Sequence, residues 1–439
     1  MSLNRRRFLM AGAGILASQR FPVIARGKES EKPNVLFIFS DQEREQVPRE
    51  LLRLPQRERL EQHGIRFTHA FCTTPQCSAS RATLMTGLYP HEAGVATNVD
   101  NSSLGRALSP DLPCLGNVFR RNGYAAGYLG KWHLGNDKNG LDDFGFSHYR
   151  ALRGQALGNA AAEWIRSQSS QPWLLTVSFL NPHDIYKTNE ALQQNLRDGV
   201  TLPENHHDDF KNKPNPQREF RENDQGKVTL SWSEKEWLHY RSYYLDLIEK
   251  VDSHLETILN AVEQTGQRQN TIVIYTSDHG DMGGAHQLPF KGPFMYEELL
   301  NVPLVISHPQ RFSQTVTCDS LVSLVDFVPT ICAMAGISWP GKLSGVDLSP
   351  LFEHPESDVR EEIFAEYFSK QKWINPIRAI RTKEWKYNLY TGGGEELYDL
   401  RRDAGEMRNM ATHPFYESQL REMQNHLQRW RVMSHDPLW

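Results

Sequence analysis

The 439-residue sequence contains few cysteines, no long hydrophobic run and little net charge. Its five cysteines form no Cys-x-x-Cys pair, and an odd number argues against a disulfide framework or a zinc knuckle. Beyond the N-terminal leader, no segment is apolar enough for a stable membrane anchor. A net charge of −4 predicts no basic field for nucleic acid. With 39% hydrophobic and 23% charged residues and no internal repeat, the chain has ordinary globular composition.

The N-terminus has the features of an export signal. Residues 4–10 (Asn-Arg-Arg-Arg-Phe-Leu-Met) resemble the twin-arginine motif, and a weakly apolar Gly/Ala-rich stretch follows over 8–17. This stretch is too short to span a bilayer, and small residues allow cleavage after Ala25. We therefore predict a signal peptide over 1–25, a Tat translocase partner and a periplasmic or secreted bacterial protein. A basic, disordered start is the alternative.

Short continuous apolar runs alternate with amphipathic stretches through most of the chain. Continuous hydrophobicity favours strands that are covered on both faces, and hence a mainly parallel sheet. Helical spacing of apolar residues indicates helices over 237–265 and 321–335. The order predicts an α/β fold with a large central sheet flanked by helices. The predicted strands are 34–39, 125–129, 173–179, 271–275 and 303–306.

Two segments depart from this rhythm. Residues 183–231 are polar, and we interpret them as an irregular insertion over the functional edge of the sheet, with a flexible surface loop as the alternative. From about residue 355 the pattern indicates a small C-terminal α+β subdomain with an antiparallel sheet. We therefore predict a catalytic domain over 30–354 and this subdomain over 355–439. The elements predicted in the subdomain are strands over 380–389 and 396–400 and a helix over 415–430.

Polar side chains follow four of the predicted strands. In an open α/β sheet, ligands bind beyond the carboxyl ends of the strands. An aspartate in such a place is usually a turn or capping residue, but four strands that deliver carboxylates, histidines and a lysine to one edge indicate a site. Oxygen ligands favour calcium or magnesium, and an imidazole shifts the preference towards manganese or zinc. The residues concerned are Asp41 and Gln42, Lys131 and His133, His183, and Asp278 with His279.

Cys77 begins the run Cys-Ser-Ala-Ser-Arg-Ala-Thr-Leu-Met-Thr-Gly over 77–87. The run predicts a short helix over 80–86, ended by Gly87 as a C-cap. A helix N-terminus lowers the pKa of a nearby thiol and binds anions through free backbone N–H groups. A lone cysteine is more often a small buried residue without a catalytic role. Whether Cys77 is functional therefore depends on the residues around it.

The spacing of Cys77 and Arg81 resembles the signature of the type I sulfatases, which are formylglycine-dependent members of the alkaline phosphatase-like superfamily. The motifs at 88–91 (Leu-Tyr-Pro-His) and 277–281 (Ser-Asp-His-Gly-Asp) follow the order of the same family, and the resemblance extends from residue 33 to about 409. It implies that a maturation enzyme oxidises the cysteine to formylglycine. It also implies that the hydrated aldehyde of this residue attacks the sulfur of a sulfate ester.

The resemblance implies one divalent metal beside this residue, usually calcium in the family, with magnesium or manganese as alternatives. Its ligands would be Asp41, Asp278, His279 and the formylglycine made from Cys77. Gln42 stands where the family commonly has a second aspartate. Its amide oxygen is a further candidate ligand that brings no charge.

The resemblance also implies roles around the sulfate. Arg81 would orient the hydrate, and Lys131 with His133 would match the family's lysine and the histidine that serves the hydrate. His183 would contact sulfate and protonate the leaving oxygen, and Lys291 would be the second sulfate-binding lysine. Cationic donors suit a sulfuryl transfer because negative charge builds on the equatorial and leaving oxygens.

Three positions depart from the common family pattern. Ala79 replaces a proline, which leaves the maturation enzyme open, while Gln42 and His279 also resemble residues of phosphonate and phosphodiester hydrolases of the superfamily. We predict an exported sulfuric ester hydrolase that acts on a sulfated sugar or polysaccharide. A phosphonate monoester or phosphodiester hydrolase is the alternative. A binding protein on a degenerate scaffold is a third hypothesis, against which the intact cysteine and its neighbours argue.

Overall fold

The computed structural model describes residues 32–101, 103–168, 171–370 and 373–437. The predicted signal peptide over 1–25 lies outside these residues. Among the helices of the described ranges, none is both long and apolar enough to cross a membrane. The predicted boundary between 354 and 355 stays a prediction.

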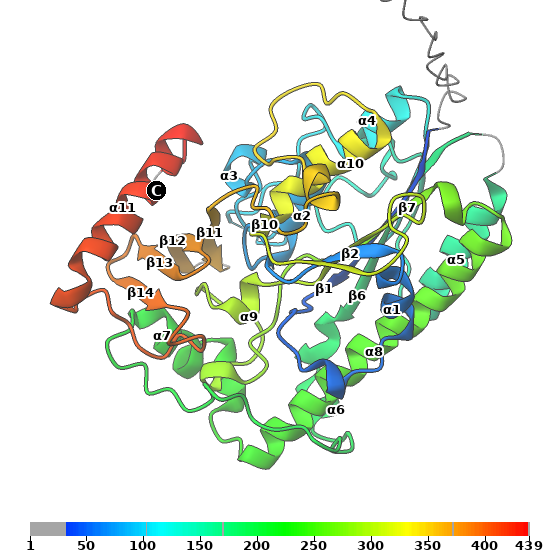
Figure 1. Ribbon diagram of the computed structural model, residues 1–439. Coiled ribbons are helices and arrows are strands. Elements are labelled where there is room, and N and C mark those ends of the chain that lie inside the picture. Colours follow the sequence, from blue (N-terminus) through cyan, green and yellow to red (C-terminus); the bar gives the residue numbers. More distant parts are fainter. Residues whose placement is uncertain (1–31, 102, 169–170, 371–372, 438–439) are drawn as a thin grey trace, which may run out of the picture. The chain divides into compact units, whose positions relative to one another are not determined.

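An eight-stranded, mostly parallel sheet forms the centre of the protein (Figure 1). Its strands are β1 (Asn34–Asp41), β2 (Gly64–Phe67), β4 (Ala125–Gly130), β5 (His148–Arg150), β6 (Trp173–Pro182), β7 (Thr271–Ser277), β8 (Leu304–Ser307) and β9 (Val316–Cys318). Their order is β5-β4-β6-β1-β7-β8-β2-β9, and only β8 runs antiparallel to its neighbours. The predicted fold class and five predicted strands are confirmed.

Both faces of this sheet are covered, which explains the continuous apolar runs. Successive side chains of a strand point to opposite faces. In β1, Val35, Phe37 and Phe39 belong to one apolar core, and Leu36 and Ile38 belong to the other. The first core is covered by α2 (Cys77–Thr86), α4 (Leu115–Arg121) and α10 (Phe327–Ala335), and the second by α1 (Pro55–Glu61), α5 (Gly154–Ser167) and α8 (Glu234–Gln264).

The two predicted helices have different outcomes. The helix expected over 237–265 is confirmed as α8, which begins after a capping box between Ser233 and Glu236. The helix expected over 321–335 is wrong in its first part. Residues 322–323 form β10 (Val322–Ser323), because their backbones pair with β3 (Ala70–Phe71), and only α10 is an α-helix.

The C-terminal part forms a second, antiparallel sheet, coloured orange in Figure 1, on which a terminal helix packs. Its elements are β11 (Glu362–Lys370), β12 (Trp373–Thr382), β13 (Trp385–Tyr390), β14 (Glu395–Asp399) and α11 (Glu417–Met433). The strands predicted at 396–400 and the final helix are confirmed. The single strand predicted over 380–389 is wrong, because a turn divides it between β12 and β13, and β11 was not predicted.

The polar insertion is more ordered than expected. It contains the short α6 (Thr188–Ala191), α7 (Asn215–Asn223) and the 3-10 turns η3 (His183–Tyr186) and η4 (Gln225–Thr229). Phe220 and Ile185 are fully buried, so these few apolar residues anchor the segment to the protein.

Candidate active site

The strand order brings the predicted polar residues to one edge of the sheet. The strands β4, β6, β1 and β7 are consecutive neighbours and all run parallel. Their carboxyl ends therefore lie together. Lys131 follows β4, His183 follows β6, Asp41 ends β1 and Asp278 follows β7. The expectation that four strand ends converge is confirmed.

Cys77 reaches this edge from α2. The helix begins at Cys77 itself, three residues earlier than expected, and all ten of its residues are buried. It ends at Gly87, whose φ of 69° is the left-handed C-cap that the sequence predicted. The thiol therefore lies in the first turn of a buried helix, at the positive end of the helix dipole. The backbone N–H of Ser78 in this turn donates to Asn98 Oδ1.

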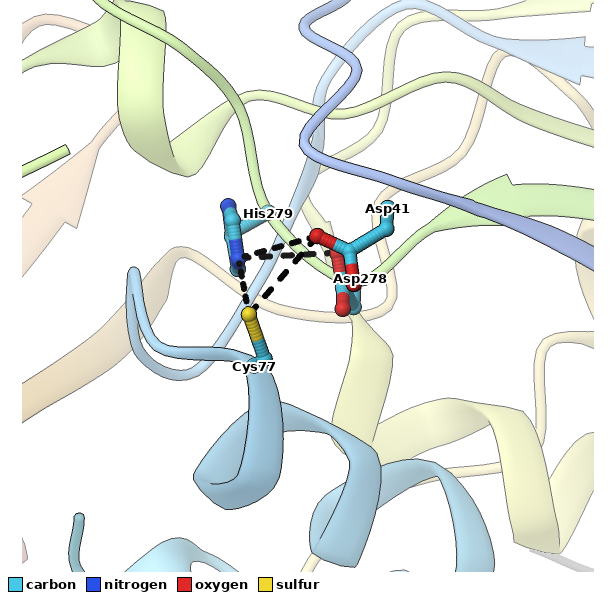
Figure 2. Close-up of side chains that lie close together, drawn as sticks. All are labelled: Asp41, Cys77, Asp278 and His279. Atoms are coloured by element: carbon cyan, nitrogen blue, oxygen red, sulfur yellow. Dashed lines mark hydrogen bonds and ion pairs between the residues drawn. The ribbon is translucent and has the colours of Figure 1, made fainter. Parts of the chain in front are cut away.

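Four side chains converge around the thiol, as Figure 2 shows. The Cys77 Sγ lies 3.6 Å from Asp41 Oδ1 and 3.3 Å from His279 Nε2. The His279 Nε2 lies 3.6 Å from Asp278 Oδ1. One donor atom from each residue lies within 4.8 Å of all the others. Two carboxylates, an imidazole and the Cys77 side chain fit a divalent metal of mixed oxygen and nitrogen ligation. We call these four residues the metal cluster.

The second nitrogen of His279 fixes how this ring faces the metal cluster. Its Nδ1 lies 2.9 Å from the Gly280 carbonyl oxygen. A carbonyl oxygen only accepts hydrogen bonds, so Nδ1 carries the hydrogen. On deprotonation, Nε2 would therefore present its lone pair to the other three residues, which is how histidine binds metals.

Arg81 ties the two carboxylates of the metal cluster together. Its guanidinium donates to Asp41 Oδ2 at 2.8 Å and to Asp278 Oδ2 at 2.9 Å. It also donates to Ser178 Oγ and to the carbonyl oxygen of Lys131. These bonds orient both carboxylates, and they fix the loop that carries Lys131 against α2.

Two lysines add positive charge beside the thiol. Lys131 Nζ lies 2.5 Å from Asp41 Oδ2. Lys291 Nζ lies 3.2 Å from Cys77 Sγ and donates to Gln42 Oε1 at 2.6 Å. The amide nitrogen of Gln42 donates in turn to Asp281 at 2.7 Å. Gln42 thus lies beside the metal cluster with its oxygen bound to Lys291, and its role as a metal ligand stays a prediction.

The pKa values reflect this concentration of charge. Burial raises the pKa of the Cys77 thiol, but the charges of Lys131, Lys291 and His279 outweigh burial and hold it well below its usual value. Burial and the neighbouring Asp41 carboxylate raise the pKa of Asp278. A divalent cation between the two carboxylates would offset this repulsion, which is a second reason that the residues fit a metal.

A cavity of about 330 Å³ opens beside the thiol. His133, His183 and Lys291 line it together with Cys77. Within the described ranges, the buried Nδ1 of His133 has no hydrogen-bond partner, so it remains able to bind a ligand. All the predicted site residues therefore lie in or next to one site.

The cavity is also lined by residues that the sequence did not reveal. Tyr186 follows His183 closely, and its ring lies 5.6 Å from Lys291 Nζ. Lys370 comes from β11, and Gln225 comes from the insertion. No motif marks these residues, because only long-range packing brings them here.

Comparisons with known proteins agree with this geometry. The sulfatase family model matches residues 33–337, and the model of the N-sulphoglucosamine sulphohydrolase C-terminal region matches residues 284–433. The chain is 27% identical to the Delta 4,5-hexuronate-2-O-sulfatase of Bacteroides thetaiotaomicron, in an alignment that covers 91% of this chain and 88% of the relative. It is 26% identical to arylsulfatase K of Bos taurus, with 87% and 78% of the two chains covered.

Solved structures extend the likeness to the whole fold. A 2-O GAG sulfatase superposes with a TM-score of 0.83 at 26% identity and covers 92% of this chain and 93% of its own. A phosphonate monoester hydrolase of Agrobacterium radiobacter superposes with a TM-score of 0.74 at 24% identity, covering 92% and 96%. That second likeness concerns the fold alone. On the family match and the site together, the chain is an enzyme that belongs to the sulfatase family, with its alkaline phosphatase-like fold.

Proposed function

We propose that the protein is an exported sulfuric ester hydrolase that removes sulfate from a carbohydrate, with formylglycine made from Cys77 and one divalent metal. The observation that carries the proposal is the position of the Cys77 Sγ. It lies between the carboxylates of the metal cluster and Lys291 Nζ, at the wall of a cavity that His133 and His183 also line. Formylglycine would supply a hydrated aldehyde as the nucleophile.

The metal cluster would hold the cation, with calcium as the expected ion and magnesium or manganese as alternatives. The metal would supply Lewis acidity and stabilise negative charge at the nucleophile. Arg81 donates to one oxygen of each carboxylate, so the other oxygen of each would be available to the ion. Gln42 positions Lys291, because its amide oxygen accepts from the ammonium group and its amide nitrogen is held by Asp281.

The basic residues of the cavity would bind the sulfate group. Lys291 and His183 line the cavity beside Cys77 and can donate to sulfate oxygens. His133 is the candidate that exchanges a proton with the nucleophile, since its buried Nδ1 has no partner among the described residues. Lys131 lies against Asp41, and its charge offsets that of the carboxylate.

A carbohydrate substrate is supported by the relatives. The curated ones include the hexuronate sulfatase named above, an ulvan-active sulfatase of Formosa agariphila at 26% identity and an N-acetylglucosamine-6-O-sulfatase of Bacteroides thetaiotaomicron at 24% identity. We extend to this protein only what these names share, a sulfated sugar.

Mass spectrometry of the peptide that contains Cys77 tests the nucleophile. Conversion of cysteine to formylglycine lowers the mass by about 18 Da, the difference between CH₂SH and CHO. The mature enzyme should release sulfate from members of a panel of 2-O-, 3-O-, 4-O- and 6-O-sulfated sugars, and Cys77→Ala should fold but release none. Near-normal turnover by Cys77→Ala would contradict the proposal.

The alternative reaction is tested with the same enzyme. His279 beside Asp278, and Gln42 after Asp41, are the positions that resemble phosphonate hydrolases. Sulfate and phosphonate esters share tetrahedral geometry, so relative rates decide between them. We expect kcat/KM for 4-nitrophenyl sulfate to exceed that for phenylphosphonate, and the reverse order would replace sulfate by phosphonate as the substrate.

Export is proposed through the Tat translocase to the periplasm or the medium, on the basis of the sequence at 4–10. This route moves folded proteins, so a cytoplasmic maturation enzyme could modify Cys77 before export. Replacement of Arg5 and Arg6 by lysine should leave the matured protein in the cytoplasm. Unchanged export of that variant would exclude the route.

A further inference from the structure

One wall of the cavity beside Cys77 has no role in the chemistry described above. Lys370, the last residue of β11, and Gln225, the first residue of η4, line this wall. Asp224 precedes Gln225 and lies against Lys370, with 2.7 Å between its Oδ2 and the lysine Nζ. The wall therefore joins the C-terminal sheet to the polar insertion, two segments about which the catalytic motifs say nothing.

The polar atoms of this wall are buried, and part of their hydrogen-bonding capacity is unused. Lys370 Nζ and Asp224 Oδ2 make an ion pair, and neither atom has a further hydrogen-bond partner in the described parts of the chain. The buried Oε1 of Gln225 likewise has no donor there. More than nine in ten buried polar groups are normally satisfied, so a group of three such atoms beside a cavity indicates a ligand or water.

The chemistry of the three atoms indicates which ligand they suit. Lys370 offers a donor, while Asp224 and Gln225 offer acceptors. A hydroxyl group both donates and accepts, so adjacent hydroxyl groups of a sugar ring match this set. The lysine and aspartate charges cancel, and a second anionic group would lie close to the Asp224 carboxylate. The wall therefore favours hydroxyl groups over a further sulfate or carboxylate.

The surroundings also suit a sugar. The Phe220 ring centroid lies 4.1 Å from Lys370 Nζ and holds the ammonium in place. Lys370 also lines a second cavity of about 640 Å³, together with Asp224 and Trp373. The wall thus stands between the space beside Cys77 and a neighbouring space, so a chain of sugar rings could continue past it.

We propose that Lys370, Asp224 and Gln225 form a sugar-binding subsite that holds hydroxyl groups of the ring bearing the sulfate. The subsite rests on the proposed function, because it binds the sugar of the sulfated carbohydrate proposed as substrate. It would make the protein selective for sulfated sugars over simple aryl sulfates. It assigns specificity to residues of the C-terminal sheet and the insertion, whereas the chemistry belongs to the edge of the large sheet.

The test compares two substrates in the matured full-length enzyme. Wild type, Lys370→Met and Gln225→Leu are assayed with 4-nitrophenyl sulfate, which lacks sugar hydroxyls, and with the best sulfated sugar of the panel. The ratio of kcat/KM for the sugar to that for the aryl sulfate should fall about tenfold in Lys370→Met, which corresponds to about 1.4 kcal/mol. The change should be mainly in KM, since the wall contacts the sugar and not the reacting sulfur.

Lys227→Met is the matched control. Lys227 lies two residues from Gln225 in the same turn but is exposed, so its loss should leave the ratio within about twofold of wild type. An unchanged ratio in both Lys370→Met and Gln225→Leu would overturn the subsite. Equal losses on both substrates would also overturn it, since they indicate a structural or catalytic role.

Failure of the proposed function can be distinguished from failure of the subsite. A wild-type enzyme with confirmed formylglycine that hydrolyses no sulfate ester refutes the proposed function. A wild type that cleaves 4-nitrophenyl sulfate but prefers no sulfated sugar refutes the subsite alone. Calorimetric titration of Cys77→Ala protein with the same sugars measures binding without turnover. Adding Lys370→Met to this variant should raise the Kd for the sugar about tenfold. An unchanged Kd would again refute the subsite.

Discussion

We expect Arg81→Met to destabilise the metal-free protein strongly and the metal-loaded protein less. The guanidinium makes four hydrogen bonds, to Asp41, Asp278, Ser178 and the Lys131 carbonyl. Its side chain is 1% exposed, and both carboxylates are fully buried. Methionine retains much of the side-chain volume but leaves two buried carboxylates without this cation.

The size of the effect follows from the burial. Removal of one partner from a buried ion pair costs about 3–5 kcal/mol. A chain of about 400 ordered residues has an unfolding entropy of roughly 0.8 kcal/mol/K, from about 2 cal/mol/K per residue. The thermal midpoint in EDTA should therefore fall by about 4–6 °C. A bound divalent ion neutralises the same carboxylates, so with saturating metal the fall should be about half as large.

Differential scanning calorimetry of wild type and variant, with EDTA and with calcium, measures both shifts. Arg57→Met is the matched control, because Arg57 is also buried and pairs with Glu43 and Asp252 away from the thiol. It should destabilise the protein by a similar amount in both conditions. If the Arg81→Met shift is below about 1 °C in EDTA, or is the same with and without metal, our account of Arg81 as the counter-charge of the metal cluster is wrong.

Three further predictions concern the metal, the backbone and pH. Chelation of the metal should lower the rate of sulfate release at least about tenfold, and addition of calcium, magnesium or manganese should restore it. Activity that survives exhaustive chelation would contradict the metal cluster. Gly130→Ala should cost about 2–4 kcal/mol in thermal unfolding and lower kcat, because its φ is 103° and a Cβ would lie 2.0 Å from a carbonyl oxygen of β6. Gly123→Ala, with φ of 85° and nothing within 4 Å, is its control and should cost about 1 kcal/mol; equal losses would refute the steric argument. Burial raises the pKa of Asp208, but His286 and Lys213 outweigh burial and lower it from 3.8 to about 2, so this carboxylate stabilises the fold above about pH 4 and loses that effect as pH falls towards 2. Asp208→Asn should therefore lower the free energy of unfolding by about 1–2 kcal/mol near pH 6 and by much less near pH 2. A loss independent of pH would count against the pairing.

The catalytic edge was predictable because it depends on local patterns. Continuous apolar runs indicate buried parallel strands, and parallel strands place the residues that follow them at one edge. Asp41, Lys131, His183 and Asp278 all follow such runs, and the structure brings them together. Gly87 was equally predictable, because a left-handed C-cap needs a glycine wherever the helix lies.

Other features could not be predicted because they depend on pairing between distant segments. The backbone of residues 322–323 is extended because it pairs with β3. The helical spacing of apolar residues in this segment therefore gave a wrong prediction of helix. The turn inside 380–389 separates β12 from β13, and the two strands then pair with each other from Ile377 opposite Tyr390 to Arg381 opposite Lys386. Periodicity within a segment carries no information about which partner that segment meets.

The sequence by itself determined the fold class, the strand ends that carry polar residues and the motif around Cys77, since each is encoded over a few consecutive residues. Only the tertiary structure decided how the charges pair. It placed Gln42 between Lys291 and Asp281. It also brought Lys370 of the C-terminal sheet to the cavity. Such contacts join residues hundreds of positions apart, and the packing of whole elements, with the need to satisfy buried polar groups, selects them.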